Sequence, residues 1–95
     1  MANIILATPD TLIYDVFSAE IAAAGHEVYW ASTGQEAYEL ALAHAADAVL
    51  LDAQLPVFNA FETCEMLRAD PDIPAQLPIL LLTDEDIDPH KLEPA

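Results

Sequence analysis

Polar side chains that could take part in chemistry stand directly after apolar runs of the sequence. The run Ala48 to Leu51 ends on Asp52, the run Asn3 to Ala7 is followed by Thr8, Pro9 and Asp10, and the run Ile79 to Leu82 is followed by Thr83. A carboxylate beside an apolar strand is costly unless it has hydrogen-bond partners. Asp52 is therefore either a site residue or an acid that accepts backbone N–H groups from its own loop.

Other chemistries find little support in the composition. Cys64 is the sole cysteine, which excludes an internal disulfide, and it fits a small buried apolar residue. The three histidines, His26, His44 and His90, stand far apart in sequence, so no transition-metal centre is expected. With 2 basic and 17 acidic residues the formal charge is -15, which argues against nucleic acid or an anionic membrane as a partner.

The elements that position these residues alternate regularly. Apolar runs predict strands at 3–7, 26–32, 48–52 and 77–84. Three helices lie between them, each with a start signal: Thr8 as a cap before Pro9, Thr33 with Glu36, and Asn59 with Glu62. The first helix carries Leu12, Ile13, Val16, Phe17 and Ile21 at three- and four-residue spacing and ends at Gly25, a position suited to positive φ.

This order predicts one small α/β domain, a flavodoxin-like parallel sheet with helices on its faces. The runs "AVLL" and "ILLL" do not alternate, as expected of strands buried on both sides. Of the aromatic pair Tyr29 and Trp30, one ring is expected in the core and the other at the surface. In such sheets the functional crevice lies beyond the carboxyl ends of the strands, which is where Asp52 falls.

The stretch "VLLDAQLPVFNAFE" resembles the receiver domain of bacterial two-component response regulators. The resemblance implies that Asp52 is the phosphoacceptor, that Leu55 and Pro56 are the Leu-Pro of the following loop, and that Thr83 contacts the phosphoryl group. It also implies a strand order of 2-1-3-4. The chain looks truncated after the fourth strand, which gives a receiver-like domain at 1–84 and an acidic tail at 85–95.

The departures from the family pattern concern the chemistry. The family's acid pair at the end of the first strand falls on Thr8 and Pro9, and only the adjacent Asp10 is acidic. The family's lysine has no counterpart, because Lys91 comes too early in the tail. Phosphoryl transfer depends on neutralising the charge on the transferring oxygens. We therefore expect no cofactor and weak Mg²⁺ binding at most, with Thr8 and Asp10 serving as helix caps.

Two functions remain open. The first is an atypical receiver, not an enzyme, that acts mainly by binding other proteins. The second is a working phosphoacceptor that a histidine kinase phosphorylates on Asp52. A flavodoxin-like cofactor binder is disfavoured, because the loops after the first and third strands lack a Gly or Ser/Thr cluster for a phosphate. Short apolar blocks and the lack of a signal peptide predict a soluble, cytoplasmic protein.

A homodimer is also expected. If the fourth strand is the last one, its apolar residues form an unprotected edge: Ile79, Leu80, Leu81 and Leu82. A sheet face around Ile5, Val49 and Leu51 would also lack a covering helix. Two such chains could pair their edges or pack their open faces together.

Overall fold

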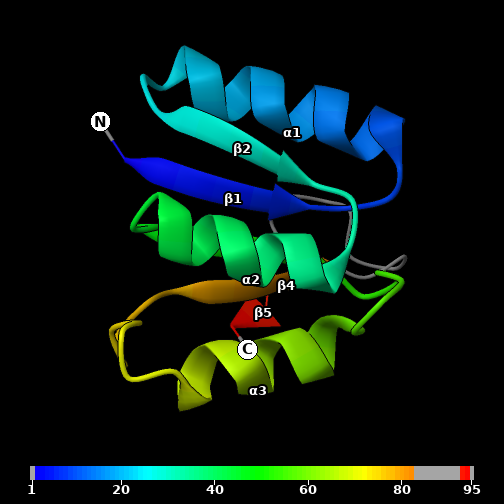
Figure 1. Cartoon of the computed structure of the whole chain (residues 1–95). Helices are drawn as coiled ribbons and strands as arrows, with labels where there is room; N and C mark the ends of the chain where they lie inside the picture. The colour runs from blue at the N-terminus through cyan, green and yellow to red at the C-terminus, as the bar shows by residue number, and fades with distance from the viewer. Residues whose placement is uncertain (1, 83–92, 95) are drawn as a thin grey trace.

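The computed structural model describes residues 2–82 and 93–94, and Figure 1 shows the elements they form. The strands are β1 (Asn3–Ala7), β2 (Glu27–Ala31), β3 (Ala48–Asp52), β4 (Ile79–Leu82) and β5 (Glu93–Pro94). The helices are α1 (Thr11–Ala23), α2 (Gly34–Ala43) and α3 (Ala60–Ala69). The sheet order is β2-β1-β3-β4-β5, in which the first four strands are parallel and β5 is antiparallel to β4. The predicted class and the order 2-1-3-4 are confirmed.

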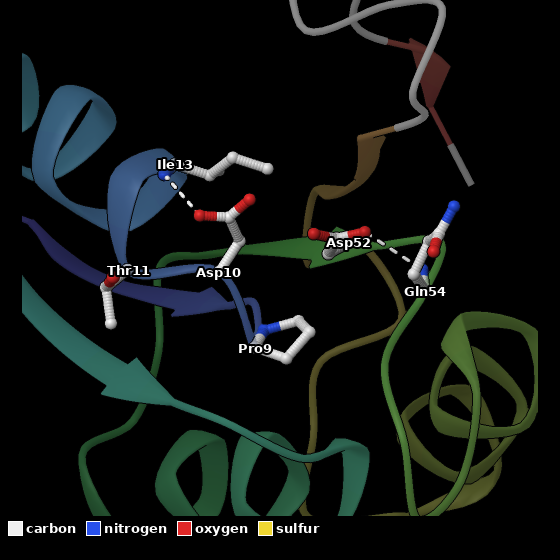
Figure 2. A pocket seen from close by; sticks show the side chains of 6 residues that line it. All are labelled: Pro9, Asp10, Thr11, Ile13, Asp52 and Gln54. Atoms are coloured by element: carbon white, nitrogen blue, oxygen red, sulfur yellow. Dashed lines mark hydrogen bonds between the residues drawn. The ribbon is translucent and has the colours of Figure 1, made fainter.

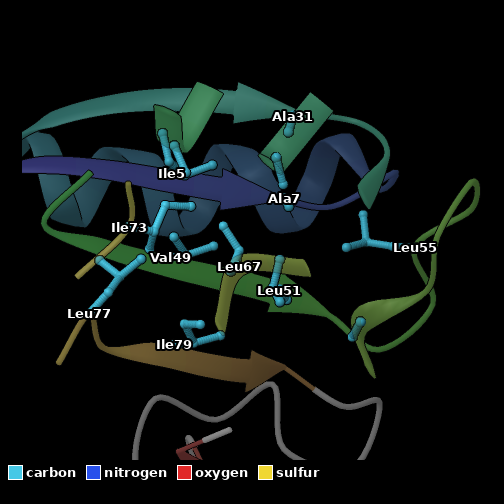
Figure 3. Close-up of a cluster of buried hydrophobic side chains, with 13 residues drawn as sticks. Ile5, Ala7, Ala31, Val49, Leu51, Leu55, Leu67, Ile73, Leu77 and Ile79 are labelled. Carbon is cyan, nitrogen blue, oxygen red and sulfur yellow. The ribbon is translucent and has the colours of Figure 1, made fainter. Parts of the chain in front are cut away.

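The helices form a layer on each side of the sheet. Helices α2 and α3 cover one face over the larger core cluster, to which Ile5, Val49 and Leu51 belong (Figure 3). Helix α1 covers the other face, where Phe17 packs with Leu6, Leu50 and Leu82. Successive residues of a strand point to opposite faces, so each of the strands β1 to β4 supplies both clusters.

Helix α1 begins later than we expected. Its N-cap is Asp10, whose carboxylate Oδ1 accepts hydrogen bonds from the backbone N–H groups of Leu12 and Ile13. The prediction that Thr8 caps this helix was therefore wrong. The C-terminal prediction is confirmed, because Gly25 has φ +90° just after the helix and its N–H donates to the carbonyl of Ala22.

The caps of the other two helices lie where the sequence placed them. Thr33 caps α2 by accepting a hydrogen bond from the backbone N–H of Glu36. Asn59 and Glu62 form a reciprocal capping box at the start of α3. Since both caps follow the loops after β2 and β3, they fix where the carboxyl edge of the sheet meets the helices.

Our prediction of which sheet face lacks a covering helix was wrong. Ile5, Val49 and Leu51 are fully buried beneath α2 and α3, so they do not form a bare face. The open surface lies on the α1 side instead, as a groove of about 310 Å³ lined mainly by apolar residues that include Ile4, Leu50 and Leu80. On α1 itself, Leu12 is 72% exposed and Val16 is 60% exposed, so these two do not join the core.

Strand β4 is not the edge of the described sheet. Strand β5 pairs with it, opposite Leu80 and Leu81, which corrects the expectation of free hydrogen-bonding groups along Ile79–Leu82. Ile79 and Leu82 are buried, and Leu80 and Leu81 are half-buried. Tyr29 and Trp30 behave as predicted, since Tyr29 packs against the α2 and α3 cluster whereas Trp30 is 42% exposed and stacks on Tyr14.

Candidate functional site

Thr8 and Asp52 come together at the carboxyl edge of the sheet. The parallel register pairs Leu6 with Leu50 and Ala7 with Leu51, so the next residues are Thr8, directly after β1, and Asp52, the last residue of β3. Both side chains point to the α1 side because they are two residues beyond Leu6 and Leu50. Thr8 is fully buried and Asp52 is 5% exposed.

Donors engage both oxygens of the Asp52 carboxylate. The Thr8 hydroxyl donates to Oδ2 at 2.7 Å, and the backbone N–H of Gln54 donates to Oδ1 at 2.9 Å. The Thr8 oxygen in turn accepts the backbone N–H of Asp10 at 3.1 Å. A chain of hydrogen bonds thus connects the N-cap of α1 to the carboxylate at the end of β3, and it satisfies the buried charge.

The backbone of Thr8 is held as firmly as its side chain. Its N–H donates to the carbonyl of Ala31 at 2.9 Å, and its carbonyl accepts the indole N–H of Trp30 at 2.9 Å. Trp30 is the only tryptophan of the chain. Its fluorescence therefore reports on the loop that carries Thr8.

An open pocket of about 450 Å³ lies over this edge of the sheet. Asp10 and Asp52 both line it, together with Pro9, Thr11, Ile13 and Gln54 (Figure 2). The Asp10 carboxylate is engaged in capping α1. Two carboxylates from different elements thus face one solvent-accessible space.

Among the described residues, no lysine or arginine side chain lines this pocket. Of the two basic residues in the sequence, Arg68 lies on α3 and donates from Nη1 to the carbonyl of Ala75 at 3.0 Å. Lys91 lies outside the described residues. Among the described residues, no three His, Cys, Asp or Glu side chains gather in a way that could hold a metal ion.

Perturbed pKa values occur away from the pocket. The hydroxyl of Tyr38 on α2 donates to the Asp70 carboxylate after α3, which lowers the pKa of Asp70 and raises the pKa of Tyr38. The Ser32 hydroxyl and backbone N–H lower the pKa of Glu36 by donating to its carboxylate. These two interactions tie the helices and loops of the α2 side together.

The structure assembles part of the predicted site. Thr8, Asp10 and Asp52 meet at one edge, and Pro9 lines the same pocket. Thr83 lies outside the described residues, so its predicted contact is not described. Sequence reasoning missed the donor role of Thr8, because a threonine before a proline and an acid is also a common helix start.

A parallel sheet in the order β2-β1-β3-β4 with carboxylates at its carboxyl edge defines a flavodoxin-like α/β domain with an edge site. The model of the response regulator receiver domain matches residues 4–93. The chain therefore belongs to the response regulator receiver domain family, a family of two-component signalling domains and not of enzymes. The resemblance inferred from the sequence is confirmed.

Individual relatives agree with this membership. The chain is 34% identical over 83 residues to the DNA-binding dual master transcriptional regulator RpaA of Synechocystis, a match that covers 87% of this chain and 34% of that protein. This chain thus spans about a third of that relative. Chemotaxis response regulator CheY4 of Vibrio cholerae has 31% identity and a TM-score of 0.83, covering 96% of this chain and 74% of that one.

A third relative holds a metal. The receiver domain of the Pseudomonas aeruginosa sensor histidine kinase PA1611 carries a coordinated magnesium ion in its active-site cleft. It has 27% identity and a TM-score of 0.79, covering 86% of this chain and 66% of that one. In the part of our chain that the structure describes, no helix is long and apolar enough to cross a bilayer.

Proposed function

We propose that this chain is an atypical receiver domain that signals mainly through contacts with other proteins. The observation that carries this proposal is the hydrogen bond from the buried Thr8 hydroxyl to Asp52 Oδ2. A receiver that takes a phosphoryl group needs positive charge on the transferring oxygens. Here the Asp52 carboxylate instead accepts a hydrogen bond from the neutral Thr8 hydroxyl. The two positions that hold the acid pair in the family are occupied by Thr8 and Pro9.

The residues present do not fit a tightly held magnesium ion. Mg²⁺ favours near-octahedral oxygen ligands and is usually held by one or two carboxylates, with waters completing its shell. Asp52 and Asp10 are the two carboxylates on the pocket, and each already accepts hydrogen bonds from the protein. These hydrogen bonds compete with an ion for the lone pairs of both carboxylates, so we expect weak binding.

The test is covalent labelling of Asp52. Purified protein is incubated with acetyl phosphate and Mg²⁺, and its intact mass is followed with Asp52→Asn as the blank. Poor labelling is expected. A Thr8→Asp, Pro9→Asp double variant should label faster, since it restores the acids and leaves the Asp10 cap of α1 intact. Rapid, stoichiometric and magnesium-dependent labelling of the unmodified sequence contradicts the proposal.

One observation favours the second candidate, a phosphoacceptor served by a histidine kinase. Asp52 and Asp10 line a pocket that is open to solvent, so a phosphodonor could reach the carboxylate. The labelling experiment separates the two functions directly. Fast modification of Asp52 supports the phosphoacceptor, and slow modification supports the binding module.

The homodimer stays a prediction, but its expected surfaces change. Strand β5 occupies the edge of β4, and the expected bare face is buried under α2 and α3. The groove on the α1 side, bordered by Phe17 and Leu80, is the surface left for a second copy. Sedimentation equilibrium at micromolar concentration tests the dimer, and a clean monomer would contradict it.

A further inference from the structure

The loop between β3 and α3 presents an apolar patch to solvent. Val57 is 58% exposed, Phe58 is 40% exposed, and Phe61 in the first turn of α3 is 73% exposed. We name these three residues the loop patch. Scattered exposed apolar residues are normal, but three large ones within five positions form a local patch of the kind found at interaction sites.

The backbone beneath the loop patch is strained. Val57 has φ +48° and Phe58 has φ +69°, and both values lie in the left-handed region. That region is unfavourable for L-residues, most of all for a β-branched side chain such as valine. Strain of this kind persists only where neighbouring groups hold it, and it is concentrated at functional sites.

The neighbouring helices supply the groups that hold the loop. At the start of α2, the backbone N–H groups of Gly34 and Gln35 donate to the carbonyls of Pro56 and Val57, at 3.2 and 3.3 Å. The Thr63 hydroxyl donates to the carbonyl of Phe58 at 3.2 Å. All these bonds use the loop backbone and leave the apolar side chains exposed. The loop patch is therefore preorganised, which lowers the entropy cost of binding.

The surrounding charges indicate what the patch can bind. Glu62 and Glu65 are exposed on α3 beside Phe61, and Glu36 is exposed in the turn of α2 that holds the loop. The only basic side chain among the described residues, Arg68, donates to a backbone carbonyl. At the loop patch a second copy would bring its own glutamates against these, which is unfavourable, whereas apolar groups flanked by Lys or Arg are complementary.

We propose that the loop patch is a docking site for a basic amphipathic helix of a partner protein. Such a helix places its apolar side chains on Val57, Phe58 and Phe61 and its cations near the glutamates of α2 and α3. The inference deepens the proposed function, because it rests on the chain acting by binding. The loop patch lies on the same loop as Gln54, which lines the pocket.

The experiment uses two synthetic 18-residue helical peptides with the same leucine spacing, one with lysines and one with glutamates on the polar face. Binding of each fluorescein-labelled peptide to the full chain is measured by anisotropy at near-physiological salt. Phe61→Ser tests the patch, and Leu12→Ser is the matched control, because Phe61 and Leu12 are equally exposed, at 73% and 72%. Circular dichroism checks that both variants stay folded.

The lysine peptide should bind, and the glutamate peptide should not. Phe61→Ser should weaken binding at least tenfold, and Leu12→Ser should leave it within twofold. Val57→Gly keeps the loop backbone conformation accessible but removes a patch side chain, so it should also weaken binding. No binding of the lysine peptide, or equal binding to the Phe61→Ser and Leu12→Ser variants, overturns the inference. Fast labelling of Asp52 together with the expected peptide results overturns the proposed function alone.

Discussion

Replacing Thr8 by valine tests the hydrogen bond on which the candidate site depends. Valine keeps the shape of the buried side chain but cannot donate to Asp52 Oδ2, which loses its 2.7 Å partner. A hydrogen bond to a charged group contributes about 1.5–3 kcal/mol. Since Asp52 lines an open pocket, water can replace part of this interaction, so we expect a loss of about 2 kcal/mol in the free energy of unfolding. In a chain of this size that lowers the melting temperature by about 10 °C.

The control is Thr8→Ser, which keeps the hydroxyl and removes one buried methyl group, at a cost of about 1 kcal/mol. Urea unfolding followed by circular dichroism gives both free energies. The valine variant should be the less stable of the two, although it loses less apolar surface. In the background of Asp52→Asn the effect of Thr8→Val should shrink, because a neutral acceptor binds the hydroxyl less strongly. Equal or greater stability of Thr8→Val relative to Thr8→Ser would refute the reasoning.

Three further predictions concern the frame around the site. Ala45 follows α2 with φ +49°, in the same position that Gly25 occupies after α1. Ala45→Gly should therefore raise the free energy of unfolding by about 1 kcal/mol, and Gly25→Ala should lower it by a similar amount. Urea unfolding measures both changes. Gly34→Ala should lower the free energy of unfolding by about 3 kcal/mol or prevent folding, because the new Cβ would clash with the backbone carbonyl oxygen of Phe58. An unchanged melting temperature contradicts this prediction. The Tyr38 hydroxyl lowers the pKa of Asp70. This hydrogen bond therefore stabilises the fold at pH values above the ordinary carboxyl pKa, and the stabilisation is lost as the pH falls through the lowered pKa of Asp70. Tyr38→Phe should therefore be less stable at pH 7 and converge with the unmodified protein in acid, which melting curves across pH would show.

Much of the fold could be predicted because local signals agreed with one another. Apolar runs, caps and the glycine after the first helix indicated the same alternation of strands and helices. The position of Asp52 at the carboxyl edge followed from that alternation. The faces of the sheet could not be assigned in the same way. Strands β3 and β4 are apolar at every core position, so they carry no period of two that separates Val49 and Leu51 from Leu50.

The loop after β3 escaped sequence analysis for a different reason. Left-handed backbone is usually signalled by glycine or asparagine, and here the positions hold valine and phenylalanine. The conformation comes from tertiary hydrogen bonds to α2 and α3, which local propensity does not encode. The closeness of Gly34 to the carbonyl of Phe58 was hidden for the same reason, since it joins segments far apart in sequence.

The role of Thr8 follows from how a fold can satisfy a carboxylate buried at the edge of its sheet. Negative charge there needs either a cation or hydrogen-bond donors, because burial without partners is costly. A second acid at position 8 could not donate to Asp52, and the two like charges would then favour a bound cation. A hydroxyl at the same position donates directly, at 2.7 Å, and needs no ion. A hydroxyl at position 8 can thus stabilise the buried carboxylate through a hydrogen bond, and it keeps Asp52 Oδ2 engaged within the protein.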